Sequence, residues 1–503
     1  MNIAFFLDIP AGLGGAGNLL LQHAVLMLGL HNPIVVIPIG ADGHYNTEYA
    51  KRCDRYRVPY ICLAYKTSFT FSYVDFIAAM DSAADIEKFA VERKIDFFHS
   101  VQLNLAVEYV SRKLGIPHLM DIYQIGREEF SLCPGDIYPH YHLCDSLLYS
   151  DLWKRQLHIE SKCVRPVALM DKVRKKNTYV REIVKILMLG SVCERKNQME
   201  AIRAVEYCMN FGRIELHIAG DMYHGYGDSC EEYVRKQGLQ NYVFFYGFVS
   251  DIRMLLESSD CLLCSSTDES FPSSIVEALT YDLTIISTPV AGVPELFTDG
   301  ENGFISKGFS CQDISESILD CLRYYRNGEI RYIHRKAAAT WSRHFDREVI
   351  KKQINSYYAG IISKNQVSSI APFHEVDERV REVRLLLEDM DDMGEKWIRG
   401  RDLYYAVVRG RMLEGNIYIW GAGKRGKLTF EILRRICLDI RIEAFVDTYK
   451  EGAYCGIPVI KVEELPLDKK SFYCISFAVG SDRAIRHLEN SGLRLNRQIW
   501  YMP

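Results

Sequence analysis

Short apolar segments alternate with longer stretches of mixed polarity along most of the chain. The short segments have the length and composition of buried strands, and the longer ones carry apolar residues at helical spacing. Up to residue 170, strands are predicted at residues 2–8, 33–39, 60–63, 97–99, 118–122 and 146–149. Helices are predicted among them at 18–30, 85–94 and 103–114. Because such alternation builds a parallel sheet with helices on both faces, this part is expected to be a doubly wound α/β domain.

The alternation restarts after a charged, turn-prone stretch at residues 171–182, which is expected to link two domains. Beyond it, strands are predicted at 184–189, 214–219, 243–246, 261–264 and 284–287, and helices at 198–208 and 273–280. This pattern predicts a second doubly wound domain, which ends near residue 362.

The last part of the chain begins differently. Residues 375–412 form a long, charged helical pattern with a single apolar stripe, which makes this segment a candidate contact for a homodimer. A strand at 416–420 and a glycine turn then open another α/β unit. The predicted domains are 1–170, 171–362, a linker with a long helix at 363–414, and a Rossmann-like domain at 415–503.

Composition narrows the class of protein. Apolar residues make up 48% of the 503 residues and charged residues 25%, as in ordinary globular proteins. The net charge of −4 provides no positive field for a polyanion, so nucleic acid is not an expected partner. The 15 cysteines are scattered, which favours reduced thiols and a cytoplasmic location. No apolar run has the length of a membrane span, so membrane contact, at the inner face, is expected to be peripheral only.

Two glutamates, Glu269 and Glu277, flank the start of the helix predicted at 273–280. Pro272 suits the first turn of a helix, and Ser273 and Ser274 can cap it. The free amides and the dipole of such a helix attract phosphate, and a glutamate one turn further in can accept hydrogen bonds from ribose hydroxyls. The alternative is that the two acids only complement the helix dipole.

Two adjacent cations, Arg195 and Lys196, lie on the loop after the strand predicted at 184–189. Ligands of open α/β sheets bind at the carboxyl ends of the strands. Paired cations at such a place can neutralise a leaving diphosphate. Without other signals they would be ordinary surface charges.

These motifs together resemble the retaining family 4 glycosyltransferases, which have the GT-B fold of two facing Rossmann-like domains. The resemblance covers roughly residues 1–362. It matches the E-x7-E element to Glu269 and Glu277, the Arg-Lys pair to Arg195 and Lys196, and a Gly-Val-Pro-Glu segment to residues 292–295. Its glycine loop matches Gly14-Gly15-Ala16-Gly17, and its histidine-containing strand end matches His99-Ser100.

The resemblance implies roles for individual residues. Glu277 would hold the ribose, Arg195 and Lys196 would stabilise the diphosphate, and Glu269 would position the sugar hydroxyls. His99 would contact the sugar, or it would be a buried structural histidine. Further donor contacts are implied for Gly14, Gly15, Gly247, Phe271, Pro272, Ser273 and Ser274.

The resemblance also implies the type of reaction. The donor would be a UDP- or GDP-sugar, and the acceptor a saccharide, a lipid-linked glycan or a protein in surface polysaccharide or glycoconjugate synthesis. No cofactor or metal is expected, since the Asp-x-Asp triplet at 389–391 falls in the charged helical pattern. One departure stands out, because the sequence reads Met120-Asp121-Ile122-Tyr123 where the family has a histidine. The alternative is a non-catalytic, glycosyltransferase-like partner subunit.

The C-terminal domain opens with a strand followed by Gly421, Gly423 and Gly426, and Asp447 ends the next strand. This spacing is typical of dinucleotide-binding sites. The segment resembles the nucleotide-sugar-binding N-terminal domain of sugar O-acetyltransferases. It is therefore interpreted as a binding or scaffold module whose ligand would be a nucleotide or NAD, with a nucleotide-sugar oxidoreductase or epimerase as the alternative.

Overall fold

The computed structural model divides into two compact units. One contains residues 1–65, 85–125 and 139–368, and the other contains residues 66–84, 126–138 and 369–503. The structure describes residues 1–8, 15–40, 42–66, 73–102, 104–123, 137, 139–157, 160–173, 182–222, 225–364, 366–374, 376–378, 381, 416–436, 441–476, 481–493 and 498–501. Gly14, the triplet at 389–391 and most of the helix expected at 375–412 lie outside these residues.

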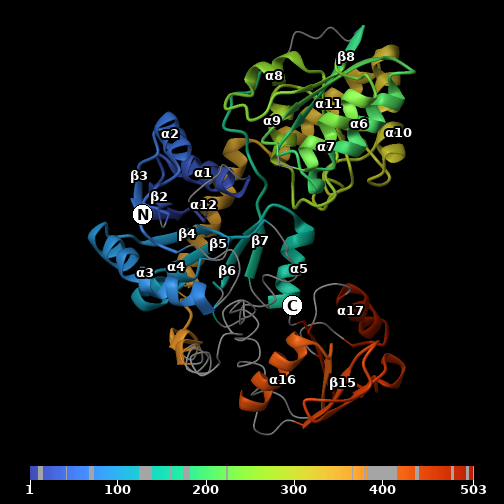
Figure 1. The fold of residues 1–503 in the computed structure, drawn as a ribbon. Coiled ribbons are helices and arrows are strands. Elements are labelled where there is room, and N and C mark those ends of the chain that lie inside the picture. Colours follow the sequence, from blue (N-terminus) through green and yellow to red (C-terminus); the bar gives the residue numbers. More distant parts are fainter. Residues whose placement is uncertain are drawn as a thin grey trace. The chain divides into compact units, whose positions relative to one another are not determined.

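The first unit begins with a seven-stranded parallel sheet in the order β3-β2-β1-β4-β5-β6-β7 (Figure 1). Its strands are β1 (Asn2–Phe6), β2 (Asn32–Pro38), β3 (Tyr60–Leu63), β4 (Phe97–Val101), β5 (His118–Asp121), β6 (Tyr141–Cys144) and β7 (Glu160–Cys163). The helices between them in sequence are α1 (Gly15–Met27), α2 (Thr47–Tyr56), α3 (Tyr73–Glu92), α4 (Leu105–Leu114) and α5 (Leu147–Leu157). Residues 73–84 of α3 are assigned to the second unit. The strand order reverses between β1 and β4, as in a doubly wound fold.

The strand predicted at 146–149 is wrong. The sixth strand is β6, and residues 147–149 instead form the first turn of α5. Ser146 caps this helix, because its Oγ accepts a hydrogen bond from the Tyr149 amide at 3.2 Å. Leu147 and Leu148 are 58% and 57% exposed, so the apolar pair that imitated a buried strand lies at the surface.

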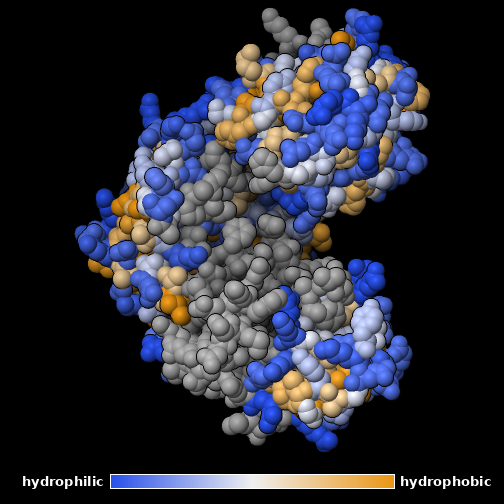
Figure 2. Space-filling model, in the orientation of Figure 1, coloured by the Kyte–Doolittle hydropathy of each residue, from blue (hydrophilic) through white to orange (hydrophobic). Residues whose placement is uncertain are grey.

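A second parallel sheet follows in the same unit, in the order β10-β9-β8-β11-β12-β13. Its strands are β8 (Ile183–Leu189), β9 (Arg213–Ala219), β10 (Val243–Phe245), β11 (Cys261–Cys264), β12 (Thr284–Ser287) and β13 (Phe304–Ile305). Its helices are α6 (Gln198–Cys208), α7 (Tyr226–Lys236), α8 (Arg253–Ser258), α9 (Ser273–Thr280), α10 (Cys311–Asn327) and α11 (Ile330–His344). The prediction of a second doubly wound sheet is confirmed. Figure 2 shows hydrophilic and hydrophobic residues interspersed on the visible face of this part of the protein.

After the second sheet, the chain returns to the first one through α12 (Arg347–Lys364) (Figure 1). Ile350, Ile354 and Tyr358 are buried in the same core cluster as Phe5 and Phe97. Helix α12 is therefore part of the core of the first sheet, although it follows the second sheet in sequence.

The second unit contains a six-stranded sheet in the order β16-β17-β15-β14-β18-β19, in which only β16 runs antiparallel to its neighbour. Its strands are β14 (Asn416–Trp420), β15 (Arg441–Val446), β16 (Gly452–Tyr454), β17 (Ile457–Ile460), β18 (Phe472–Ile475) and β19 (Ile499–Tyr501). Helices α16 (Lys424–Ile436) and α17 (Ser481–Asn490) accompany it. Gly426 is required at the start of α16, because a Cβ there would lie 1.8 Å from the carbonyl oxygen of Gly421.

Across the described residues of both units, no helix combines the length and the apolar character needed to span a bilayer.

Candidate functional site

The strand order of the second sheet reverses between β8 and β11, and two loops meet at the carboxyl ends of these strands. The loop after β8 contains a 3-10 turn, Glu194–Lys196 (η2). The loop after β11 is bound to it, since the Thr267 amide donates to the Arg195 carbonyl at 2.8 Å and the Ser265 hydroxyl donates to the Lys196 carbonyl at 2.7 Å. Ligands of open α/β sheets bind at such a reversal.

Three of the residues predicted from the sequence come together at this point. Arg195 Nη1 lies 2.6 Å from Glu269 Oε1, and the Lys196 ammonium forms an ion pair with the same oxygen. Arg195 also donates to the carbonyl of Asp268 at 2.9 Å. Burial alone would raise the pKa of Glu269, but Lys196 and Arg195 hold it below its usual value. The cluster is therefore a carboxylate held between two cations.

Glu277 lies on α9, one element beyond this cluster, in a different electrostatic setting. It lines a cavity together with Gly190, Ser191, Gly220 and residues 248–253. Burial raises the pKa of Glu277 to about 7, against the opposing effects of Arg52 and Lys196. The Glu277 side chain makes no hydrogen bond or ion pair with the part of the chain that the structure describes, which leaves its carboxyl group available to a ligand.

Backbone geometry connects the cavity with the cation cluster. A Cβ on Gly190, which has a φ of +129°, would lie 3.4 Å from the Lys196 Nζ. A Cβ on Gly220 would lie 2.0 Å from the Gly190 carbonyl oxygen, so the loops after β8 and β9 approach closely only because residue 220 is a glycine. Gly190, which lines the cavity, therefore separates it from the Lys196 ammonium.

The other residues predicted to contact the donor lie in several different places. Pro272 precedes the first turn of α9, and Ser273 and Ser274 form that turn. Phe271 is buried in the core, where its ring lies 5.4 Å from that of Phe345. Gly247 has a φ of +63° and its carbonyl accepts a hydrogen bond from the Gly220 amide. Gly15 begins α1 and does not line the cavity.

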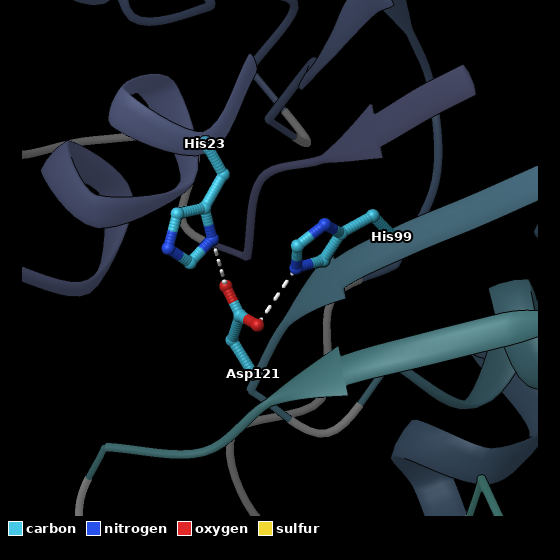
Figure 3. A group of neighbouring side chains, drawn as sticks. All are labelled: His23, His99 and Asp121. Carbon is cyan, nitrogen blue, oxygen red and sulfur yellow. Dashed lines mark hydrogen bonds and ion pairs between the residues drawn. The ribbon is translucent and has the colours of Figure 1, made fainter. Parts of the chain in front are cut away.

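His99 belongs to a buried group at the carboxyl ends of β4 and β5 (Figure 3). Its Nε2 lies 2.7 Å from Asp121 Oδ1, and its Nδ1 lies 2.5 Å from the Tyr358 hydroxyl. The other oxygen of Asp121 lies 3.1 Å from His23 Nδ1 and accepts a hydrogen bond from the Tyr123 hydroxyl at 2.8 Å. The structure thus places His99 in a hydrogen-bond network rather than at the cavity.

The same group has the residue types of a metal site, since ligand atoms of His23, His99 and Asp121 lie within 4.8 Å of one another. Each carboxylate oxygen, however, is already within hydrogen-bond distance of a histidine nitrogen. Burial would raise the pKa of Asp121, but the two histidines hold it well below its usual value. The geometry is that of an ionised carboxylate satisfied by protein donors.

Residues near the first sheet contact the loops of the site. The Ser270 hydroxyl donates to Asp145, and the Tyr149 hydroxyl donates to Asp268 at 2.8 Å. Glu295, the last residue of the predicted Gly-Val-Pro-Glu segment, accepts hydrogen bonds at 3.0 Å from the amides of the first two residues of α5. Glu295 also pairs with Arg165. These contacts join the two sheets of the first unit next to the cation cluster.

In the second unit, Asp447 holds the glycine loop. Its Oδ2 accepts a hydrogen bond from the Ala422 amide at 2.9 Å, and its Oδ1 accepts from the amides of Tyr449 and Lys450. The Lys450 ammonium donates to the Ala422 carbonyl. Both oxygens of this carboxylate, which belongs to the predicted dinucleotide-binding pattern, are therefore engaged by the backbone.

Residues 170–337 match the family model of the glycosyl transferases group 1. Among curated proteins, the putative glycosyltransferase EpsD of Bacillus subtilis is 29% identical over 154 residues, which is 30% of this chain and 39% of EpsD. The lipopolysaccharide 1,6-galactosyltransferase of Salmonella typhimurium is 26% identical over 153 residues, which is 29% of this chain and 41% of that enzyme. The chain thus matches about two fifths of the length of these relatives.

Solved structures resemble a larger part of the chain. Anabaena Alr3699/HepE in complex with UDP has a TM-score of 0.58 and 19% identity, covering 72% of this chain and all of that one. The lipopolysaccharide outer core galactosyltransferase WaaB has a TM-score of 0.54 and 17% identity, with the same coverage. At this level of identity the likeness shows the fold, and the first unit has the GT-B fold.

Proposed function

We propose that this protein is a retaining glycosyltransferase that uses a nucleoside diphosphate sugar, because residues 170–337 match the family model of the glycosyl transferases group 1. The observation that carries the proposal is the pairing of Arg195 and Lys196 with Glu269 beside the cavity that Glu277 lines. This arrangement offers a site for a diphosphate next to a site for a ribose.

In this proposal the nucleotide occupies the cavity, and Glu277 accepts hydrogen bonds from the ribose hydroxyls. The diphosphate competes with Glu269 for Arg195 and Lys196, because both are anionic. Glu269, once displaced, is placed to accept hydrogen bonds from the sugar hydroxyls. The backbone of Gly190 can approach the phosphates without interference from a side chain.

The chemistry that follows is electrostatic. Negative charge grows on the diphosphate as the bond to the anomeric carbon breaks, and the two cations stabilise that charge where it develops. The leaving phosphate oxygen takes the proton of the acceptor hydroxyl as the new bond forms on the same face, so the configuration is retained. No protein nucleophile is assigned, and we expect transfer to proceed without added metal or cofactor.

The donor is proposed to be a UDP- or GDP-sugar. UDP is the first nucleotide to test, because solved relatives were captured with UDP and with UDP-glucose. Curated relatives are named for transfer to lipopolysaccharide, which supports a saccharide or lipid-linked acceptor, with a protein acceptor as a further candidate. A role in surface polysaccharide or glycoconjugate synthesis is consistent with both.

For the third sheet we propose a binding or scaffold role in preference to oxidoreductase chemistry. The support is the engagement of Asp447 by three backbone amides, which occupies most of the acceptor capacity that the ribose of NAD would need. Gly421, Gly423 and Gly426 keep the loop open to a nucleotide phosphate in this proposal.

The test compares three proteins in thermal-shift titrations with UDP and GDP and in a donor-hydrolysis assay. A ligand that binds the folded state raises the apparent melting temperature with its concentration. We expect one nucleotide to stabilise the wild type. Glu277→Gln should raise the dissociation constant for that nucleotide at least about tenfold. Glu231→Gln, on the exposed face of α7, should leave the dissociation constant unchanged. Equal binding and hydrolysis by Glu277→Gln and the wild type would exclude the proposed site.

A further inference from the structure

The cavity that Glu277 lines is bounded on its other side by two helices of the first sheet, α1 and α2. They contribute Asn18, Leu21, Gln22, Arg52, Arg55 and Tyr56 to its lining. None of these residues belongs to the sequence motifs that marked the donor site. The cavity therefore has a wall that the motifs did not reveal.

Arg52 and Arg55 are three residues apart on α2, so they lie on one side of that helix. Arg52 is partly buried, and its Nη1 donates a hydrogen bond to Asn18 Oδ1, which ties the guanidinium to α1. Holding an arginine in one place in this way reduces the entropy that is lost when a ligand binds.

We propose that Arg52 is a positioning residue of the donor site, which lines the cavity opposite the second sheet and keeps the Glu277 side chain charged for the nucleotide. The inference rests on the proposed function, because it concerns the same nucleotide.

The charges around Glu277 support this role. The other charged residues that line the cavity are Arg52, Arg55, Asp221, Asp251 and Arg253. Asp251 and Arg253 pair with each other, with Arg253 Nε 2.8 Å from Asp251 Oδ1. Lys196, behind Gly190, is committed to Glu269. Of the two cavity-lining cations on α2, Arg55 acts on Asp251, whereas Arg52 acts on Glu277.

The charge of Arg52 affects how much of Glu277 is protonated near neutral pH. Burial raises the pKa of Glu277 to about 7, and Arg52 is the foremost of the two groups that lower it. Without Arg52 the pKa rises further, so more of the carboxyl is protonated at neutral pH. A protonated carboxyl has lost an acceptor and the charge that strengthens its hydrogen bonds to ribose hydroxyls. Nucleotide affinity should therefore depend on Arg52 most at low pH and least at high pH.

The experiment measures the dissociation constants of UDP and uridine by calorimetry between about pH 6 and about pH 9; GDP and guanosine replace them if the wild type prefers guanine. Arg52→Met removes the charge, Arg52→Lys restores it, and Lys51→Met is the matched control on the exposed side of the same helix. We expect Arg52→Met to weaken both ligands about tenfold at neutral pH, with the loss shrinking towards high pH. Arg52→Lys should recover most of it, and Lys51→Met should match the wild type.

Unchanged affinity in Arg52→Met would overturn the inference. So would a loss independent of pH and confined to UDP, because Arg52 would then be a phosphate ligand. If Glu277→Gln weakens binding while Arg52→Met does not, this inference fails and the proposed function stands. If the wild type binds neither nucleotide, both the proposed function and this inference are wrong. Melting temperatures of the variants show that the fold is retained.

Discussion

Glu269 and Glu277 are two acids of the candidate site in opposite electrostatic settings. Glu269 is held ionised between two cations, whereas burial raises the pKa of Glu277 to about 7. Environments that separate the pKa values of neighbouring acids are typical of functional sites. In the proposed function, the diphosphate takes the place of Glu269 as the partner of Arg195 and Lys196. Glu277 accepts hydrogen bonds from the ribose.

The first prediction at this scale concerns Arg195. If its guanidinium stabilises charge on the leaving diphosphate, Arg195→Ala should lower kcat by about a hundredfold to a thousandfold. Arg195→Lys should recover part of the rate, because it keeps the charge without the planar fork. The measurement is steady-state transfer from the donor that the thermal-shift test identifies. Arg203→Ala is the control, since Arg203 lies on α6 and pairs with Glu200 at the surface. A kcat equal to that of the control would remove Arg195 from the chemistry.

The sequence predicted those residues of the candidate site whose neighbours along the chain mark a strand end or a helix start. Arg195, Lys196, Glu269 and Glu277 each stand beside a strand end or a helix start, and the structure groups the first three. Arg52 has no such signal, because only the fold brings α2 to the cavity. The network around Asp121 is likewise assembled from three different elements and from α12.

At the scale of elements, the strands of the second sheet were the most predictable. The strands predicted at 184–189, 214–219 and 243–246 agree with β8, β9 and β10 to within one residue at each end. They are short, apolar and bounded by polar turns, so their pattern has one interpretation. The error at 146–149 arose because two exposed leucines at a helix start imitate the same pattern.

Helix α12 is the element whose place the sequence did not disclose, since an amphipathic helix does not specify which sheet it covers. Its buried side belongs to the core of the first sheet. Ile354 is fully buried there, whereas Gln353 is exposed. Ile354→Asp should lower the free energy of unfolding by more than about 3 kcal/mol, because it buries an unpaired charge.

The measurement for Ile354→Asp is urea unfolding followed by circular dichroism, with Gln353→Asp as the control. A fall of less than about 0.5 kcal/mol, as expected of a surface change, would contradict the placement of α12. The helix would then be peripheral to the first sheet.

At the scale of the molecule, the first unit joins its two sheets through polar contacts beside the proposed donor site. Ser270 donates to Asp145, Tyr149 donates to Asp268, and Glu295 caps α5. The motif residues of the second sheet are thereby tied to the end of the sixth strand of the first. A motif that indicates a ligand in sequence therefore also serves, through Ser270 and Glu295, to connect the two sheets.

Asp145 provides the prediction at this scale, because it is a buried acid at that connection. Burial raises its pKa to about 8, although the Ser270 hydroxyl and Arg165 act in the opposite direction. An acid whose pKa is higher in the folded protein than in the unfolded chain, where it is about 3.9, binds a proton on folding throughout the interval between the two values. The contribution of Asp145 to stability therefore falls as the pH rises from about 4 to about 8.

Asp145→Asn removes this proton uptake while keeping an oxygen that can accept from Ser270. The variant should consequently gain stability relative to the wild type as the pH rises, with the largest gain near pH 8 and little or none near pH 4. The measurement is the difference in melting temperature between the two proteins at about six pH values across that interval, with Asp151→Asn, on the exposed side of α5, as the control. A difference that does not change with pH would mean that Asp145 is ionised in the folded protein, and that the sheets are joined there by a charged contact with Arg165 instead of a protonated acid.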